Sequence, residues 1–165
     1  MDGYKNVLIS IGYFERSCGF ICGKSEIANW NPFEVCQLLH TTKDLYGKLA
    51  DFVPTYTVED EKNFIKLSLG NLFHELCHRY IHSDREKNIV RLPLTYKSVF
   101  FIIQNMYYID SGIFIATKRE LIKHLKNKDK EVMEMALMLK DNKEYDFNYA
   151  FDVLFTWCQN AIITI

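Results

Sequence analysis

Two histidines and a glutamate in the middle of the chain have the spacing of a metal-dependent hydrolase. Residues 74–78 read His-Glu-Leu-Cys-His, which matches the pattern HExxH. On a helix, histidines at this spacing project to one side and can share a zinc ion, while the glutamate can act as general base on the bound water. One hypothesis is therefore a zinc-dependent hydrolase that uses His74, Glu75 and His78.

A catalytic zinc ion usually needs a third protein ligand, and the sequence offers no motif for one. His82 continues the same helical face, but it lies about 12 Å along the axis from His74 because a helix rises about 1.5 Å per residue. Acidic residues and one histidine downstream are only generic candidates: Glu120, His124, Glu131 and Glu134. We therefore keep the zinc hydrolase as an alternative and expect no bound metal in the leading interpretation.

A second group of chemically capable residues flanks the Ser-Gly dipeptide at 111–112. Tyr107, Tyr108 and Asp110 precede it, and core packing explains at least one of the tyrosines. The functional interpretation is one wall of a small-molecule pocket with an acid at its edge. Lys118 and Arg119 follow at an expected helix start, where the helix dipole disfavours their charge. A solvated surface explains them, and so does contact with a phosphate.

The composition indicates a folded protein whose partners are not selected by overall charge. The chain has 165 residues, is 48% hydrophobic and carries a formal net charge of −1. We therefore expect no nucleic-acid partner, and no apolar run is long enough to span a membrane. Five scattered cysteines and an N-terminus without a signal peptide favour reduced thiols in a cytoplasmic protein. The sequence contains no P-loop, GxSxG or GxGxxG motif.

The elements that position these residues are expected to be mainly helices. Asn6–Phe14 is rich in β-branched and aromatic residues and predicts a strand, with a second short strand at Gly19–Gly23. Helix signals and apolar periodicity then predict six helices. The first begins after Asn31, the second runs from Thr57 to about His82–Arg85, and the third covers Leu94–Asp110 after Pro93. The fourth begins with a capping box at Thr117, the fifth covers Asp129–Lys140 and the sixth covers Tyr145–Ile162.

These signals together predict the fold class. We expect a mainly α protein, an antiparallel bundle of five to six helices with a short N-terminal β element. The β element would occupy residues 1–30 and the helical bundle residues 31–165.

Three segments resemble the C-terminal helical domain of the aminoglycoside adenylyltransferases, in particular the streptomycin/spectinomycin group. Leu38–Lys48 contains the Leu-Tyr-Gly of the family, and Phe52–Asp60 resembles the link into its first long helix. Val99–Lys118 resembles its helix, Thr-Gly turn and Lys-containing helix start, although Met106 or Tyr107 stands where the family commonly has Trp. Ala136-Leu137 and Trp157 fall where the family has a further helix pair, and the resemblance covers about residues 35–160.

The resemblance implies a substrate-binding domain without the half of the enzyme that does the chemistry. The family's N-terminal nucleotidyltransferase domain carries Gly-Ser and paired Asp residues that hold magnesium and the ATP phosphates. This sequence has no Gly-Ser dipeptide and no Asp-x-Asp, so residues 1–30 correspond at most to a remnant of that sheet. By position, Tyr107, Tyr108 and Asp110 would face a cationic sugar, and Lys118 and Arg119 would approach phosphates.

The leading expectation is thus a truncated or stand-alone helical substrate-binding domain that is inactive alone. It would use no cofactor alone, and ATP and magnesium only if paired with an upstream nucleotidyltransferase domain. Its ligand would be a small cation. A zinc-dependent hydrolase and a structural helical module that forms a homodimer remain alternatives.

Overall fold

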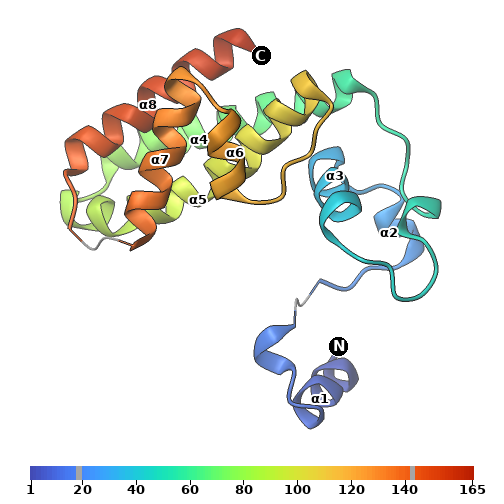
Figure 1. The fold of residues 1–165 in the computed structure, drawn as a ribbon. Helices are drawn as coiled ribbons and strands as arrows, with labels where there is room; N and C mark the ends of the chain where they lie inside the picture. The colour runs from blue at the N-terminus through green and yellow to red at the C-terminus, as the bar shows by residue number, and fades with distance from the viewer. Residues whose placement is uncertain (18–19, 142–143) are drawn as a thin grey trace.

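The computed structural model describes residues 1–17, 20–141 and 144–165, and helices dominate all of them (Figure 1). No strand occurs in these described residues, so the prediction of a mainly α fold is confirmed. The bundle consists of α4 (Val58–His82), α5 (Arg85–Ser111), α6 (Lys118–His124), α7 (Asn127–Asp141) and α8 (Phe147–Thr164).

The bundle core lies where four long helices meet. Helix α4 packs against α5 and α8, while α7 packs against the same two helices and short α6 packs on α7. Figure 1 shows α8 running beside α4, with α7 on the near side of the bundle. The largest fully buried side chains come from all five helices and include Ile65, Tyr96, Ile103, Leu121, Met133 and Trp157. Removal of such side chains from water supplies the main stabilising free energy of this fold.

The predicted N-terminal β element is wrong. Residues Asp2–Ser10 form helix α1, and Phe14–Arg16 form a short 3-10 helix, η1. β-propensity requires a neighbouring strand to pair with, and the described chain offers none. Tyr4, Val7 and Leu8 recur at helical spacing, a signal that β-branched composition obscured. Of the second predicted strand, Phe20–Gly23 is irregular and Gly19 lies outside the described residues.

Two short helices and a 3-10 turn lead from α1 to the bundle: α2 (Lys24–Ile27), α3 (Pro32–Thr41) and η2 (Leu49–Asp51). The predicted start of α3 is confirmed, because the Asn31 side chain accepts a hydrogen bond from the Glu34 backbone at 2.8 Å. Helix α3 packs on α4. It is also tied to α5, since the Gln37 amide donates to Gln104.

Helix α4 begins and ends as the sequence predicts. Thr57 forms a capping box with Asp60, so the two orphan N–H groups of the first turn gain partners. At the other end, the Asn88 side chain donates to the Arg79 carbonyl at 2.9 Å. None of the described helices is both long and apolar enough to cross a membrane.

Helix α5 begins nine residues earlier than Pro93 led us to expect, at Arg85, and this is a correction. Proline inside a helix removes one hydrogen bond, because its nitrogen carries no hydrogen for the carbonyl four residues before. That carbonyl belongs to Ile89, and the Tyr145 hydroxyl donates to it instead. The helix therefore continues through Pro93 to Ser111, where Gly112 adopts a left-handed φ of 69°.

The last three helices match their predicted positions to within about two residues at the ends. Thr117 caps α6 as predicted, and its side chain accepts from the Glu120 backbone at 3.4 Å. The full capping box is not formed, because the Glu120 carboxylate pairs with Lys123 at 2.6 Å instead.

Candidate functional site

The three predicted substrate residues at the C-terminal end of α5 face two different hollows. Tyr107 and Asp110 line an open cleft of about 590 Å³ between the ends of α5, α6 and α8 and the start of α7. We call it the α5–α8 cleft, and its lining residues are Tyr107, Asp110, Ser111, His124, Leu125, Lys126, Asn127, Lys128, Asp129, Asn160 and Thr164. Tyr108 does not line this cleft.

The α5–α8 cleft combines an aromatic wall with carboxylates. The Tyr107 ring lies beside the His124 imidazole, with ring centroids 5.9 Å apart. Asp129 is fixed in place, because its carboxylate accepts from the Trp157 indole nitrogen at 2.7 Å. Asp110 is exposed at the cleft edge, and among the described residues its carboxylate forms no ion pair or hydrogen bond. The cleft can therefore offer a free and a fixed carboxylate to a ligand.

Tyr108 lines a second hollow of about 290 Å³ on the other side of α5, which we call the α3–α5 pocket. Its walls come from α3, the segment 50–56 and the first turns of α4. The lining residues are Pro32, Val35, Cys36, Leu39, His40, Ala50, Val53, Pro54, Thr55, Tyr56, Glu61 and Tyr108. Sequence analysis did not identify this pocket.

Aromatic contacts fix one side of the α3–α5 pocket. The His40 imidazole stacks on the Phe114 ring at 4.4 Å and meets the Tyr108 ring edge-on at 4.9 Å. The Tyr56 hydroxyl donates to the Trp30 carbonyl, which holds this second tyrosine against the wall. His40, Phe114 and Tyr108 therefore restrain one another, and the hydrogen bond restrains Tyr56.

Partial burial changes the titration of three groups in the α3–α5 pocket. Burial raises the pKa of the Glu61 carboxyl above its usual value. Burial, with Glu61 nearby, raises the pKa of the Cys36 thiol to about 11. The pKa of Tyr108 is also raised, by burial first and then by Cys36 and Glu61. Desolvation disfavours each charged form, so Glu61 is the only described lining residue that brings a full negative charge here at neutral pH.

The sequence did contain a signal for Glu61. It lies four residues before Ile65 and eight before Leu69, both fully buried on the apolar stripe of α4. A carboxylate on an apolar stripe is unusual, because charged groups are rarely buried without a partner. Its position in the first turn of α4, where the helix dipole favours acidic residues, obscures this signal.

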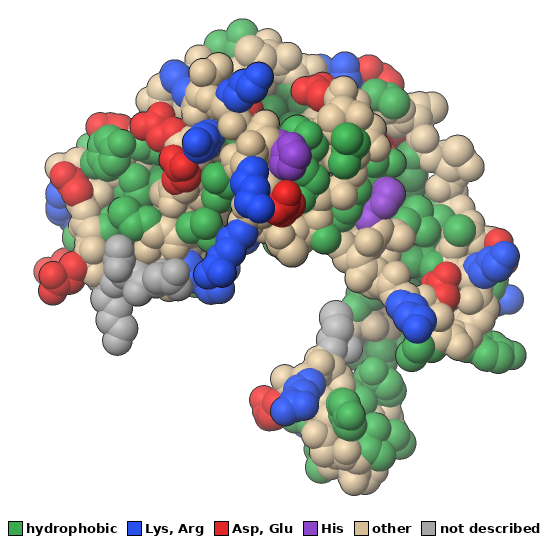
Figure 2. All heavy atoms as spheres, viewed as in Figure 1, with side chains coloured by type: hydrophobic (Ala, Val, Ile, Leu, Met, Phe, Trp, Pro, Cys, Tyr) green, Lys and Arg blue, Asp and Glu red, His purple; other side chains and the backbone are tan. Residues whose placement is uncertain are grey.

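The predicted phosphate contacts, Lys118 and Arg119, line neither hollow. The Lys118 ammonium lies over the Phe100 ring, 5.4 Å from its centroid. Burial lowers the pKa of Lys118, and nearby Lys140 and Lys97 lower it further. Figure 2 shows Lys and Arg side chains in a run near α6 and α7, with Asp and Glu side chains beside them. The arrangement is a mixed-charge surface with one partly buried lysine.

The HExxH histidines form an exposed stripe along α4. Ring centroids are 6.1 Å apart for His74 and His78, and 4.8 Å apart for His78 and His82. The Glu75 carboxylate pairs with Arg79 at 2.6 Å, so the expected general base is already engaged. In the part of the chain that the structure describes, no group of three or more His, Cys, Asp or Glu side chains is placed to hold a metal ion.

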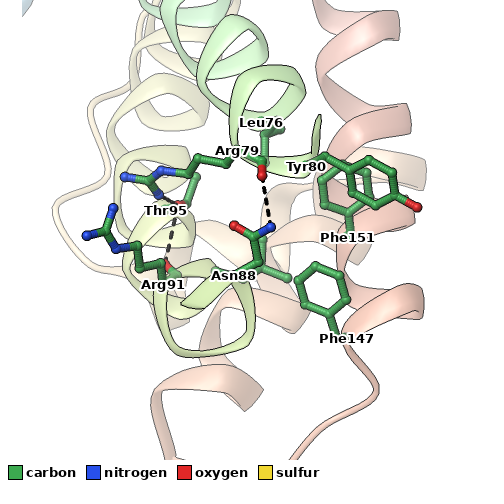
Figure 3. Close-up of a pocket in the computed structure, with 9 residues that line it drawn as sticks. Leu76, Arg79, Tyr80, Asn88, Arg91, Thr95, Phe147 and Phe151 are labelled. Atoms are coloured by element: carbon green, nitrogen blue, oxygen red, sulfur yellow. Dashed lines mark hydrogen bonds between the residues drawn. The ribbon is translucent and has the colours of Figure 1, made fainter. Parts of the chain in front are cut away.

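The hydrogen bonds of Arg79, which lies next to His78 on α4, hold the fold together. Arg79 also donates to the Thr95 hydroxyl at 2.8 Å, and its backbone carbonyl accepts from Asn88. Figure 3 shows these residues around a small hollow that Phe147 and Phe151 close on the α8 side. The hollow holds about 10 Å³, the space of one water molecule. Arg79 therefore links α4 to α5 and is not part of a ligand pocket.

The generic third-ligand candidates are engaged elsewhere. Glu120 pairs with Lys123, and it also lies 3.6 Å from the His124 imidazole. Glu134 lies 3.8 Å from Lys130, and Glu131 accepts from the Tyr149 hydroxyl at 3.3 Å. The structure thus does not bring any of them to the histidine stripe.

Comparison with known proteins adds no relative. A scan against protein-family models, a search of curated proteins and a search of solved structures each find no match to this chain.

Proposed function

We propose that this chain is a helical substrate-binding domain of the aminoglycoside adenylyltransferase type, and that the α5–α8 cleft binds its small cationic ligand. One observation carries the proposal. Tyr107 and Asp110, selected from the sequence for this role, line the same cleft, and Asp129 adds a second carboxylate from α7. Cationic amines pair with carboxylates and pack on aromatic faces, so this lining suits an amino sugar.

Two features of the cleft lower the affinity that we expect for a cationic ligand. Lys126 and Lys128 stand at the rim and oppose a cation there. The cleft is open, so much of the ligand surface stays in water. Dissociation constants for aminoglycosides are therefore expected at about 100 μM or weaker.

The same proposal predicts no transfer of AMP by these residues alone. Adenylyl transfer needs a carboxylate-held magnesium ion to neutralise charge that develops on the phosphates. The sequence contains no Asp-x-Asp and no Gly-Ser dipeptide for that purpose. ATP and magnesium would enter only with a separate nucleotidyltransferase domain.

Titration calorimetry with streptomycin and with spectinomycin, at low and high salt, tests the proposal. Asp110→Asn and Tyr107→Ala are expected to weaken binding, and added salt should weaken it further because charge attraction is screened. Asp152→Asn is the matched control, since it removes the same charge from an exposed position on α8 outside the cleft. Salt-insensitive binding that Asp110→Asn leaves unchanged would reject this cleft. Magnesium-dependent adenylylation by the chain alone would reject the inactive-domain proposal.

A further inference from the structure

The α3–α5 pocket has the chemistry of a separate binding site. It is lined by one carboxylate, Glu61, and by the rings of His40, Tyr56 and Tyr108. None of its described lining residues is a lysine or an arginine. With a volume of about 290 Å³, the pocket is near the lower end of the range for small-molecule sites, about 300–1,000 Å³.

The Glu61 carboxylate has no partner within the described protein. It forms no ion pair and no hydrogen bond with another described side chain, although it is half-buried. A desolvated carboxylate without a partner costs free energy, and a bound cation would recover it. The two acids that precede Glu61 in α4 do not carry this cost. Asp60 takes part in the capping box with Thr57, and Glu59 is exposed to water.

The aromatic rings complete the case for a positively charged occupant. Ring faces attract cations, and the attraction grows when the site is partly desolvated. The contact of His40 with Phe114 and Tyr108 holds the wall in place, so little ordering is needed on binding. Prolines 32 and 54 and Val35 supply apolar contacts for the carbon atoms of the ligand.

We propose that the α3–α5 pocket binds a small organic cation, an amine or quaternary ammonium compound, with Glu61 as counter-ion and the rings of His40, Tyr56 and Tyr108 as its wall. This inference does not depend on the function proposed for the α5–α8 cleft, because the two hollows share no lining residue.

The test compares choline with 3,3-dimethyl-1-butanol, which has the same shape without the charge. In NMR or calorimetric titrations, choline is expected to bind at least about tenfold more tightly than the neutral alcohol, a difference of about 1.4 kcal/mol. n-Pentylamine is titrated as a second cation, because it shows whether the pocket prefers a primary or a quaternary ammonium group. Tighter binding of either cation than of the alcohol supports the site.

Substitutions then locate the site. Glu61→Gln keeps the side-chain shape and is expected to weaken cation binding by about tenfold or more. Glu59→Gln removes the same charge from the exposed first turn of α4 and should leave binding unchanged. Tyr108→Leu should weaken binding, whereas Tyr149→Leu, at an exposed position on α8 outside both hollows, should not.

The pH dependence provides an independent measurement. Protonation of Glu61 removes the counter-charge, so acidification should weaken binding. His40 lines the same pocket. Cys36, Tyr56 and Tyr108 also face the pocket, and they stay neutral as the pH falls. His40→Phe keeps the stack on Phe114 and isolates the effect of Glu61.

Three results would overturn the proposal. They are binding of neither cation more tightly than of the neutral alcohol, cation binding that Glu61→Gln leaves unchanged, and no binding of either cation at millimolar concentration. The last result is decisive for this pocket even if aminoglycosides bind, because Asp110→Asn reports on the cleft and Glu61→Gln on the pocket.

Discussion

The hydroxyl of Tyr145 donates a hydrogen bond to the carbonyl of Ile89, which is the carbonyl that Pro93 leaves without a helical donor. Tyr145, two residues before α8 begins, thus supplies the donor that the proline removes from α5. A partly buried carbonyl without a donor is costly, so the hydroxyl explains how α5 continues through a proline.

We predict that Tyr145→Phe lowers the free energy of unfolding by about 1–2 kcal/mol, because the Ile89 carbonyl then loses its donor. In a Pro93→Ala background the alanine N–H can serve that carbonyl, so the same substitution should cost less. A double-mutant cycle by urea unfolding measures the coupling. Additive effects would show that Tyr145 contributes only its own packing. Tyr149→Phe, at an exposed position in α8, is the control.

A second prediction concerns the pH dependence of stability at Glu61. Its pKa is raised in the folded state, so the unfolded chain binds fewer protons and stability falls as pH rises through the folded-state pKa. Glu61→Gln removes this penalty. The melting temperature should therefore rise near pH 7 and change little below the usual pKa of a glutamate carboxyl, 4.5. Thermal melts at several pH values check this, with Glu59→Gln as the control. A lower melting temperature at pH 7 would mean that Glu61 has a stabilising partner.

The third prediction is that the described cysteines divide into two classes by their rate of reaction with a disulfide reagent. Cys36 and Cys158 are buried, and burial raises their pKa values to about 11 and about 12. Cys22 and Cys77 are partly exposed. Since the thiolate is the reactive form, we expect Cys36 and Cys158 to react with a disulfide reagent at least roughly tenfold more slowly than the exposed pair.

Timed thiol counting in native buffer checks this order, and single Cys→Ala variants assign each class. Cys18, which we also expect to be a reduced thiol, lies outside the described residues. Thiol counting on the denatured protein should find all five cysteines of the sequence. A defined disulfide would contradict the prediction.

The fourth prediction concerns metal. Protein purified without added metal should contain well under one equivalent of zinc, because no third ligand meets the histidine stripe within the described part of the chain and Glu75 pairs with Arg79. His78→Ala should leave the melting temperature nearly unchanged, as expected for an exposed side chain. Elemental analysis that finds one tight zinc, lost in this variant, would revive the hydrolase alternative.

The sequence by itself determined where most helices begin. Asn31, Thr57 and Thr117 each cap a helix, because a cap involves a side chain and backbone only three residues apart. The apolar period likewise predicted the buried face of α4, since Ile65, Leu69 and Leu72 all point into the core. These features are local, so no knowledge of the fold was needed.

Only the tertiary structure decided which residues meet across helices. Tyr107 and Tyr108 are neighbours in sequence, yet successive helical residues point about 100° apart, so they line different hollows. Gln104 is fully buried because it donates to the Ile115 carbonyl at 2.5 Å and accepts from Gln37. Such pairings depend on the packing of α3 against the bundle, as the repair of Pro93 depends on Tyr145 more than fifty residues later. A periodic pattern records which face of a helix is buried, whereas the partner that covers it is set by the arrangement of all the helices together.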